Sequence, residues 1–321
     1  MKRSLLTVMV ACALAAATSS ALAQNYPTKP IKAVLALAGG GETLARLVGQ
    51  KAGEALGQPL IIDPQPAVAG SIAATQVARA APDGYTIMYG ATNSQVYRVF
   101  LAKNVPYDPI KDFTPIGMVS EAVLVVAVSN QSGIRTMQDL VARAKKEPGK
   151  LFYGTSGVGT SHHLSAELLQ TVIGVKMTHV PYKDPSIVAT ELMADRLPTG
   201  WGIFGTMYQP HMSGKLRIIA INNTTRYGRT PDIPTVTEGV PGYTPPPGWN
   251  AWFGPAGLPR PIVTRLNTEL NKAVMAPDLK DKIDALGFIP VTSTPEELAE
   301  NVKKGLEIAG RIIKGAGIEP E

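Results

Sequence analysis

The sequence predicts an α/β protein of two lobes with a cleft between them. Short apolar runs rich in β-branched residues alternate with segments whose apolar residues recur at helical spacing, as in α/β folds. The alternation occurs in two sets along 321 residues, a length that supports a sizeable buried core. The segment 222–249 is different, because it holds six prolines and has no sustained period. We expect it to be an ordered segment that crosses between the lobes.

The first lobe begins as a β-α-β-α-β unit. Its strands are predicted where short apolar runs end at turn residues, at 31–37, 60–62 and 86–89. Its helices are predicted between these strands, at 42–56 and 72–80. The apolar residues of the first helix lie on one face, and the sequence Ala-Pro-Asp-Gly at 81–84 ends the second.

The second set of elements follows the same rules. Strands are predicted at 124–128, 151–153, 177–180, 200–204 and 216–221. Helices are predicted at 137–146, 161–173 and 187–194. Beyond the proline-rich segment come strands and helices at 251–253, 262–275, 278–286, 289–291 and 295–314. This C-terminal part is too small for a domain of its own, so we expect it to pack on the first lobe.

These elements divide the chain into a signal peptide and two lobes. The signal peptide is 1–23, the first lobe combines 24–123 with 247–321, and the second lobe is 124–246. Open α/β sheets bind ligands at the loops that follow their strands. We therefore expect the site in the cleft between the lobes.

The first 23 residues have the three parts of a secretory signal. Lys2 and Arg3 give a positive start, 5–17 is apolar, and small residues at 21–23 form a cleavage site. No later apolar run reaches the roughly 18 to 20 residues that span a bilayer. The sequence therefore predicts an exported, soluble product.

Cys12, the single cysteine, lies inside the apolar part of this signal. A lipoprotein would carry its modified cysteine there, but Met9-Val10-Ala11 is a poor lead-in, so cleavage after Ala23 is favoured. Cleavage leaves 298 residues without a cysteine, which excludes disulfides, thiolate catalysis and cysteine metal sites.

The charge of the chain argues against nucleic acid as a partner. Lys plus Arg minus Asp plus Glu is 31 − 25 = +6, and loss of Lys2 and Arg3 leaves about +4. No basic run is dense enough to form a nucleic-acid footprint.

Three predicted strand-to-helix loops share one design, in which glycine precedes a helix and leaves backbone N–H groups free. Together with the helix dipole, such loops bind carboxylates or phosphates without an arginine. The residues expected to bind an anion there are Gly40, Gly41, Gly70, Ser71, Thr155, Ser156, Gly159, Thr160 and Ser161. Thr92, Asn93 and Ser94 follow the third strand and can add hydrogen bonds. The alternative is that these glycines serve turn geometry alone and the polar residues cap their own turn.

Nucleotide-binding and metal-binding motifs are not met. The loop 154–159 lacks the Lys-Ser/Thr ending of a phosphate-cradling loop, and 39–41 lacks the spaced third glycine of a dinucleotide fingerprint. His162 and His163 are helix neighbours that point about 100° apart, which is wrong for two ligands of one metal. We expect neither a metal nor a cofactor.

One enzymatic alternative remains. Ser156 or Ser161 with His162 could form a serine hydrolase, although 154–158 lacks the last glycine of the Gly-x-Ser-x-Gly elbow. If the protein is instead a binding protein, replacing His162 by Ala should leave ligand binding nearly intact.

Two further side chains are candidates for selectivity. Trp201 and Phe204, at the end of a second-lobe strand, could line a cleft wall, with core packing as the alternative. Arg98 follows the polar loop after the third strand and could pair with an acidic ligand, or it could face solvent.

Motifs along the whole predicted mature chain resemble those of the Bug (TctC-type) periplasmic solute receptors of tripartite tricarboxylate transporters. In the first lobe these are Tyr26-Pro27-Thr28-Lys29-Pro30-Ile31, 80–86 (AAPDGYT), 105–109 (VPYDP) and 111–113 (KDF). In the rest of the chain they are 157–164 (GVGTSHHL), 179–183 (HVPYK), 232–236 (DIPTV) and 316–320 (AGIEP).

This resemblance implies a type II-like, clamshell periplasmic binding protein that closes on a small organic acid. It implies that backbone N–H groups, hydroxyls and waters hold the carboxylate, and that a membrane permease pair receives it. It implies no catalysis, and we expect a monomer. A receptor that acts as a sensor or scavenger without its own permease is the alternative.

The chain departs from the family pattern in its ligand loops. The family's proline-containing first loop is replaced by a shorter one, 36–42, and Glu42 stands where an Asp is usual. The glycine-rich start of the next helix is Ala67-Val68-Ala69-Gly70. Gln95 and Arg98 stand where relatives often carry His and Asn, and Gly202 stands where the family has an Asp. The identity of the acid therefore does not carry over from any relative.

Overall fold

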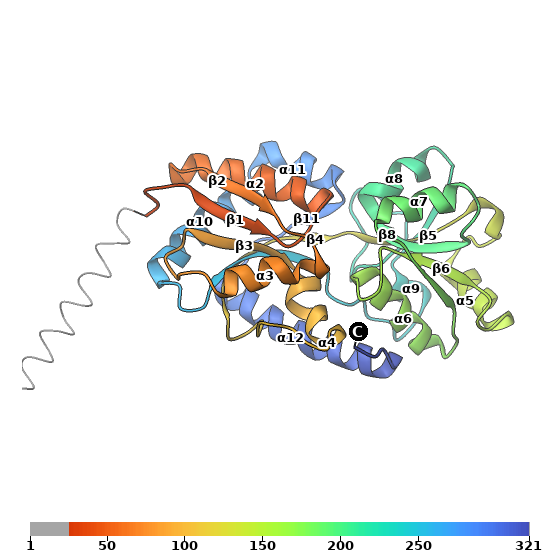
Figure 1. The fold of residues 1–321 in the computed structure, drawn as a ribbon. Helices are drawn as coiled ribbons and strands as arrows, with labels where there is room; N and C mark the ends of the chain where they lie inside the picture. The colour runs from red at the N-terminus through yellow and green to blue at the C-terminus, as the bar shows by residue number, and fades with distance from the viewer. Residues whose placement is uncertain (1–25, 321) are drawn as a thin grey trace, which may run out of the picture.

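The fold is taken from a computed structural model, which describes residues 26–320. The predicted signal peptide, its cleavage site and Cys12 lie outside the described residues. Within 26–320 the predicted two-lobed α/β fold is confirmed, and the two lobes lie side by side (Figure 1).

The sheet of the first lobe has six strands in the order β11-β4-β10-β3-β1-β2. Three of them, β1, β2 and β3, are parallel, and β10, β4 and β11 pair antiparallel. The bounds are β1 Ile31–Leu35, β2 Leu60–Pro64, β3 Thr86–Ala91, β4 Phe113–Ala122, β10 Trp249–Pro255 and β11 Phe288–Pro290. Strand β10, from the C-terminal part of the chain, therefore lies in the middle of the sheet.

Helices cover both faces of this sheet (Figure 1). Apolar residues of α2 Gly40–Leu56, α10 Arg260–Val274 and α11 Pro277–Ala285 form one core with the sheet. The other core joins it to α3 Ser71–Ala78, α4 Arg98–Leu101 and α12 Pro295–Ala316. Short turns precede α3 and α4: a 3-10 turn, η1 Val68–Gly70, and a π-helical turn, η2 Asn93–Tyr97.

The sheet of the second lobe has five strands in the order β7-β6-β8-β5-β9. The bounds are β5 Leu124–Val128, β6 Phe152–Thr155, β7 Thr178–Pro181, β8 Thr199–Ile203 and β9 Arg217–Ile221. Its two cores lie against α5 Met137–Lys146, α6 Ser161–Ile173 and α9 Val236–Gly239, and against α7 Pro185–Met193 and α8 Phe204–Met212. A 3-10 turn, η3 Asn130–Ser132, follows β5.

The chain passes between the lobes in segments that are hydrogen-bonded to one another. The Ala122 N–H donates to Gly248 O at 2.8 Å. The Asn223 side chain accepts the Leu124 N–H at 3.1 Å and donates to Ala122 O at 3.0 Å. The predicted lobe boundaries near 124 and 247 stay a prediction, which the distribution of strands over the two sheets supports.

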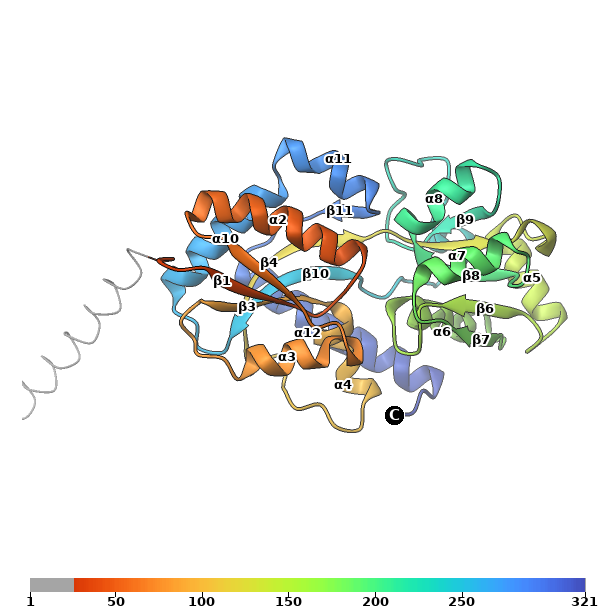
Figure 2. The same cartoon turned by 45° about the horizontal axis from the view of Figure 1, so that its top comes forward.

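The C-terminal part packs on the first lobe, as expected, but it also reaches the second. Leu164 of α6 lies in the same core as Ala309 and Ile312 of α12. Figure 2 shows α12 running beneath the first lobe to α6. Among residues 26–320 the structure has no helix that is long and apolar enough to cross a membrane.

Candidate functional site

In the first lobe, three of the predicted loops meet at Gly70. Its φ is +82°, and a Cβ there would lie 2.6 Å from both Cβ and O of Ala36 and 3.1 Å from Ser94 Cβ. Ala36 follows β1 and Ser94 follows β3, and parallel strands end at the same edge of a sheet. The close approach that only glycine allows therefore gathers the ends of β1 and β3 around the start of α3.

Helices α2 and α3 both begin at this edge, and neither has a side-chain cap within the described chain. The Ser71 N–H donates to Val68 O in the turn before α3. The other N–H groups of the two first turns have no intrahelical partner, and the dipole adds positive potential. Gly40 and Gly41 form the first turn of α2, where Glu42 also lies. The Glu42 carboxylate is paired with Arg46 at 2.7 Å, whereas α3 has no acidic residue in its first turn.

The polar residues after β3 are more buried than a surface turn would be. Thr92 and Ser94 are buried, Ser94 Oγ donates to Ala91 O at 3.1 Å, and Tyr107 Oη donates to Ser94 O at 2.6 Å. Asn93 Oδ1 is buried without a hydrogen-bond partner among residues 26–320. The π-helical turn that carries it is a conformation found often at functional sites.

In the second lobe, the loop from Thr155 to Thr160 connects β6 to α6. Thr155 Oγ1 accepts the Gly157 N–H at 3.2 Å, and Thr160 Oγ1 donates to Gly157 O at 2.9 Å. Thr160 also caps α6, because its hydroxyl accepts the His163 N–H at 3.3 Å. These hydroxyls shape the loop. The half-buried Ser161 opens the helix behind it.

The two lobes contact each other at two glycines of the second lobe. A Cβ on Gly159 would lie 2.5 Å from Leu101 Cδ1, so the β6–α6 loop touches α4 of the first lobe. On the opposite lobe edge, Gly205 at the start of α8 lies against Leu286 and Gly287. Within the first lobe the loops at 36–42, 70–71 and 92–94 thus meet around Gly70, and the loop at 155–161 reaches that lobe through the contact of Gly159 with Leu101.

Trp201 does not line the face of the second lobe that meets the first lobe. Its side chain is 1% exposed and packs edge-on against Tyr153 in the core beneath α5 and α6. Phe204 is likewise in a core, stacked on Tyr208. The ring of Trp201 therefore fills the lobe interior, and any effect it has on a ligand must pass through other residues.

Arg98 lines a hollow of about 440 Å³ beside α3, together with Ser71, Ile72 and Arg79, so it lies near one of the predicted anion-binding residues. Its Nε atom is buried without a hydrogen-bond partner among residues 26–320. A second hollow, of about 300 Å³, lies where the chain passes between the lobes and is lined by Glu121, Asn223 and Trp249.

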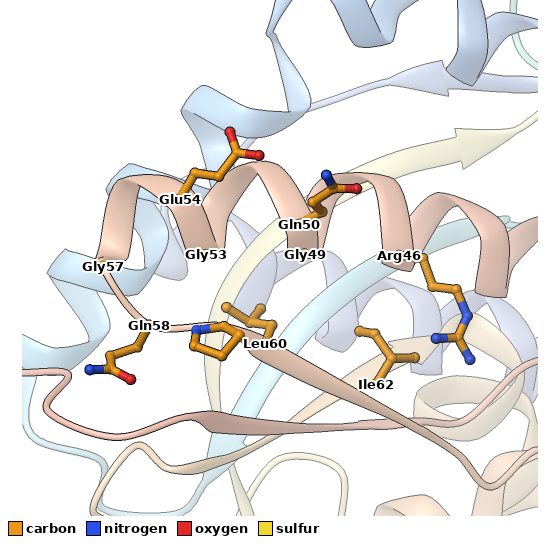
Figure 3. A pocket seen from close by; sticks show the side chains of 10 residues that line it. Arg46, Gly49, Gln50, Gly53, Glu54, Gly57, Gln58, Leu60 and Ile62 are labelled. Atoms are coloured by element: carbon orange, nitrogen blue, oxygen red, sulfur yellow. The ribbon is translucent and has the colours of Figure 1, made fainter.

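A groove of about 560 Å³ lies between α2 and β2 (Figure 3). Gly49 and Gly53 of α2 line it, and a Cβ on Gly49 would lie 3.4 Å from Ile62 Cδ1. The small residues let the helix lie close to the edge strand. None of the residues predicted to bind an anion lines this groove, so it is not part of the candidate site.

Three histidines surround the β6–α6 loop. From the sequence, His162 and His163 were considered as site residues, whereas His179 was given no role. Ser156 Oγ lies 2.5 Å from His162 Nδ1, and burial lowers the pKa of His162 to about 4. His163 Nδ1 accepts the Gly159 N–H at 3.2 Å, and His179 Nε2 lies 2.7 Å from Thr155 Oγ1. The signal that could have indicated His179 is its place in a strand neighbouring the loop.

Comparison with known proteins assigns the chain to a family. The model of the tripartite tricarboxylate transporter family receptor, TctC, matches residues 44–318. The chain therefore belongs to this family, and the resemblance noted from its motifs is confirmed.

Curated relatives agree with this assignment over almost their whole length. A UPF0065 protein from the tcbD-tcbE intergenic region of Pseudomonas sp. strain P51 is 34% identical, covering 94% of this chain and 91% of the relative. BugT of Bordetella pertussis is 27% identical, covering 100% and 98%.

Solved structures show the same fold. R. palustris Rpa4515 with adipate is 30% identical with a TM-score of 0.83, covering 92% of this chain and 100% of that one. MatC from Rhodopseudomonas palustris with bound malate is 26% identical with a TM-score of 0.78, covering 90% and 100%.

Proposed function

We propose that this receptor captures a small organic acid between its lobes and delivers it to the membrane permease pair of a tripartite tricarboxylate transporter. The observation that carries the proposal is that α2 and α3 begin without a side-chain cap in the first lobe, while the β6–α6 loop of the second lobe touches α4 of the first through Gly159. Backbone N–H groups at such helix starts suit a carboxylate without any arginine.

The class of acid follows from the charges near these loops and from the neighbours. Helices α3 and α6 have no acidic residue in the first turn. Each lobe therefore has one helix N-terminus whose positive potential no neighbouring carboxylate of that turn offsets. The structural neighbours bind adipate and malate, which both carry two carboxylates. We therefore propose an aliphatic dicarboxylate as the first class to test.

The cellular setting is part of the same proposal. The predicted signal peptide and the family support a periplasmic, monomeric receptor that needs no cofactor, performs no catalysis and binds no nucleic acid. A receptor that serves as a sensor or scavenger would bind the same acid, and uptake assays with the permease would separate the two roles.

The Ser156–His162 pair does not raise the hydrolase alternative to a proposal. In a serine hydrolase the second imidazole nitrogen is oriented by a carboxylate. Here His162 Nε2 is buried and has no hydrogen-bond partner among the described residues. The ring thus lacks the group that would make it a general base.

A thermal-shift screen of residues 24–321 against aliphatic, aromatic and amino-acid carboxylates tests the proposal. A ligand at 100 times its Kd adds about 2.7 kcal/mol to the free energy of unfolding, which shifts a protein of this size by several degrees. A shift with one class supports the receptor and names its cargo. No shift with any carboxylate, in protein shown to be free of co-purified ligand, would contradict it.

A further inference from the structure

Two histidine rings lie face to face behind the β6–α6 loop. His163 on α6 and His179 on β7 have ring centroids 4.2 Å apart and planes inclined by 18°. The ring of Tyr153 is also stacked on His179, with centroids 4.9 Å apart. The proposed function uses the loop in front of these rings and leaves the rings themselves without a role.

Each ring holds one part of the loop. His179 Nε2 is 2.7 Å from Thr155 Oγ1, and that same oxygen accepts the Gly157 N–H. His163 Nδ1 accepts the Gly159 N–H at 3.2 Å. Gly157 and Gly159 have φ of +119° and +74°, so this loop has an unusual backbone shape that depends on its anchors.

We propose that His163 and His179 are a pair of positioning residues that hold the 155–160 loop in its ligand-binding shape only while both rings are neutral. The inference rests on the proposed function, because it concerns the loop that would bind the carboxylate. It adds an acid-sensitive support to that site.

The hydrogen bond from Gly159 explains why neutrality matters. The N–H needs the lone pair of His163 Nδ1, and a proton on that nitrogen would set two N–H groups against each other. If both stacked rings were charged, two like charges about 4 Å apart would repel strongly in a buried setting. Protonation therefore opposes the loop shape directly at the Gly159–His163 hydrogen bond, and repulsion between two charged rings opposes the stacking that places His179 beside Thr155.

The carboxylate beside the pair cannot compensate both charges. Glu167 Oε1 lies 3.9 Å from His163 Nε2. The same oxygen already accepts hydrogen bonds from Tyr153 Oη and Gln170 Nε2, each at 2.6 Å. Lys176 lies 3.7 Å from the other oxygen and offsets part of its charge.

The remaining titratable neighbour is His162, which faces Ser156 rather than the pair. Burial, and then the nearby His163, lower the pKa of His179 to about 4. His179 is therefore neutral at neutral pH and takes up a proton only in acid.

The first test needs no ligand. Imidazole nitrogen shifts of 15N-labelled protein, recorded from about pH 8 to about pH 4, report the tautomer and charge of each ring. We expect His163 to carry its proton on Nε2, and the Gly159 amide signal to move as the pair takes up its first proton. A His163 that is protonated on Nδ1 near neutral pH, or a Gly159 amide that ignores the titration, would overturn the inference.

The second test measures binding of adipate and malate as a function of pH, with each Kd calculated for the free dianion, because the carboxyl groups of the ligand also take up protons at about pH 4 to 5. We expect the wild-type Kd to increase about tenfold between about pH 7 and pH 4. Loss of one buried hydrogen bond would weaken binding by about this factor. His163→Asn and His179→Gln keep polar groups near the positions of Nδ1 and Nε2 but do not titrate. They should stay within about threefold of wild type near pH 7 and lose the acid response, whereas His163→Ala should weaken binding about tenfold.

His211 provides the matched control. It lies on α8, its Nδ1 accepts the Ile218 N–H at 3.3 Å, and it has no part in the loop. His211→Asn should keep the wild-type pH profile. A flat wild-type profile, or an acid response that persists in His163→Asn and His179→Gln, would overturn the inference. If neither acid binds the wild type, the proposed function fails for those acids, and the first test still decides the role of the pair.

Discussion

Gly205 of the second lobe and Gly287 of the first lobe are in backbone contact. A Cβ on Gly287 would lie 2.4 Å from the Gly205 nitrogen, and a Cβ on Gly205 would lie 2.4 Å from Leu286 O. Because the atoms opposite Gly205 belong to the backbone, no side-chain rotation can make room for a methyl group. The absence of side chains at this point therefore sets how closely the lobes approach.

Gly205→Ala should force the lobes apart at this edge. We expect the free energy of unfolding to fall by about 1–3 kcal/mol, as for other overpacked contacts, and carboxylate binding to weaken with it. Urea denaturation and calorimetric titration measure the two effects. Gly228→Ala is the control, since its Cβ would meet no described atom within 4 Å. Equal behaviour of the two variants would contradict this contact.

Gly70→Ala should destabilise the first lobe. The residue has φ +82°, and its Cβ would lie 2.6 Å from Ala36 O, so strain and a backbone clash add up to about 2–3 kcal/mol. Gly133→Ala has a similar φ of +72° but no described atom within 4 Å of its Cβ. It should lose only the strain, about 1 kcal/mol, in the same urea experiment. A loss in Gly70→Ala no greater than in the control would show that Ala36 gives way.

His162→Ala separates the receptor from the hydrolase. The side chain is 5% exposed, so we expect a loss of about 2–3 kcal/mol in stability, with the Kd for a carboxylate within a few fold of wild type. Hydrolysis of p-nitrophenyl esters should be at the blank level in both proteins. Ester turnover by the wild type that disappears in the variant would favour the hydrolase.

Stability should fall in mild acid. Burial lowers the pKa of His162 to about 4 from its ordinary 6.5, and burial and His163 do the same to His179. Between these values the unfolded chain binds more protons than the folded one, so the free energy of unfolding decreases as the pH falls from about 6.5 to about 4. Urea midpoints near pH 7.5, 6 and 5 measure this, and His162→Ala should reduce the drop.

The ion pair of Glu238 and Arg226 affects stability in a different pH range. Arg226 and then the Thr235 N–H lower the pKa of Glu238 to about 2. Its contribution is lost only below the ordinary carboxyl value of 4.5. A midpoint that does not change between about pH 7.5 and pH 5 would therefore contradict the histidine assignment.

Trp201→Phe tests whether that side chain selects the ligand. The ring packs against Tyr153 in the core, so the substitution should cost about 1–3 kcal/mol in stability while the order of preference among acids stays the same. The thermal-shift screen repeated on the variant gives that order. A changed order at unchanged stability would place the ring against the ligand.

Much of the fold could be predicted because local signals agree with the final packing. Helix α5 begins at Met137 as predicted, since Thr136 and Asp139 form a capping box in the structure. Strand β4 was missed because Pro115 and Gly117 break the pattern of a strand. The register of β4 with β10 shifts between these two residues, which is how the sheet accommodates them.

The candidate site was predictable only in its loops. Glycine before a helix is visible in sequence, so the loops at Gly70 and Gly159 could be identified. The tryptophan at 201 was assigned to a core or to a cleft wall with no means of choosing, because strand periodicity does not say which face is covered. The pairing of Thr155 with His179 joins residues 24 positions apart and exists only through the parallel register of β6 and β7.

The position of β10 has a consequence for how the protein is made. In the order β11-β4-β10-β3-β1-β2, strand β10 lies between β3 and β4 and pairs with both, yet it is formed by residues 249–255. Most of the chain must therefore be synthesised before β10 can pair with β3 and β4 and complete the first sheet. Residues 31–122 therefore reach their final sheet only after the strand that joins their two parts has been synthesised.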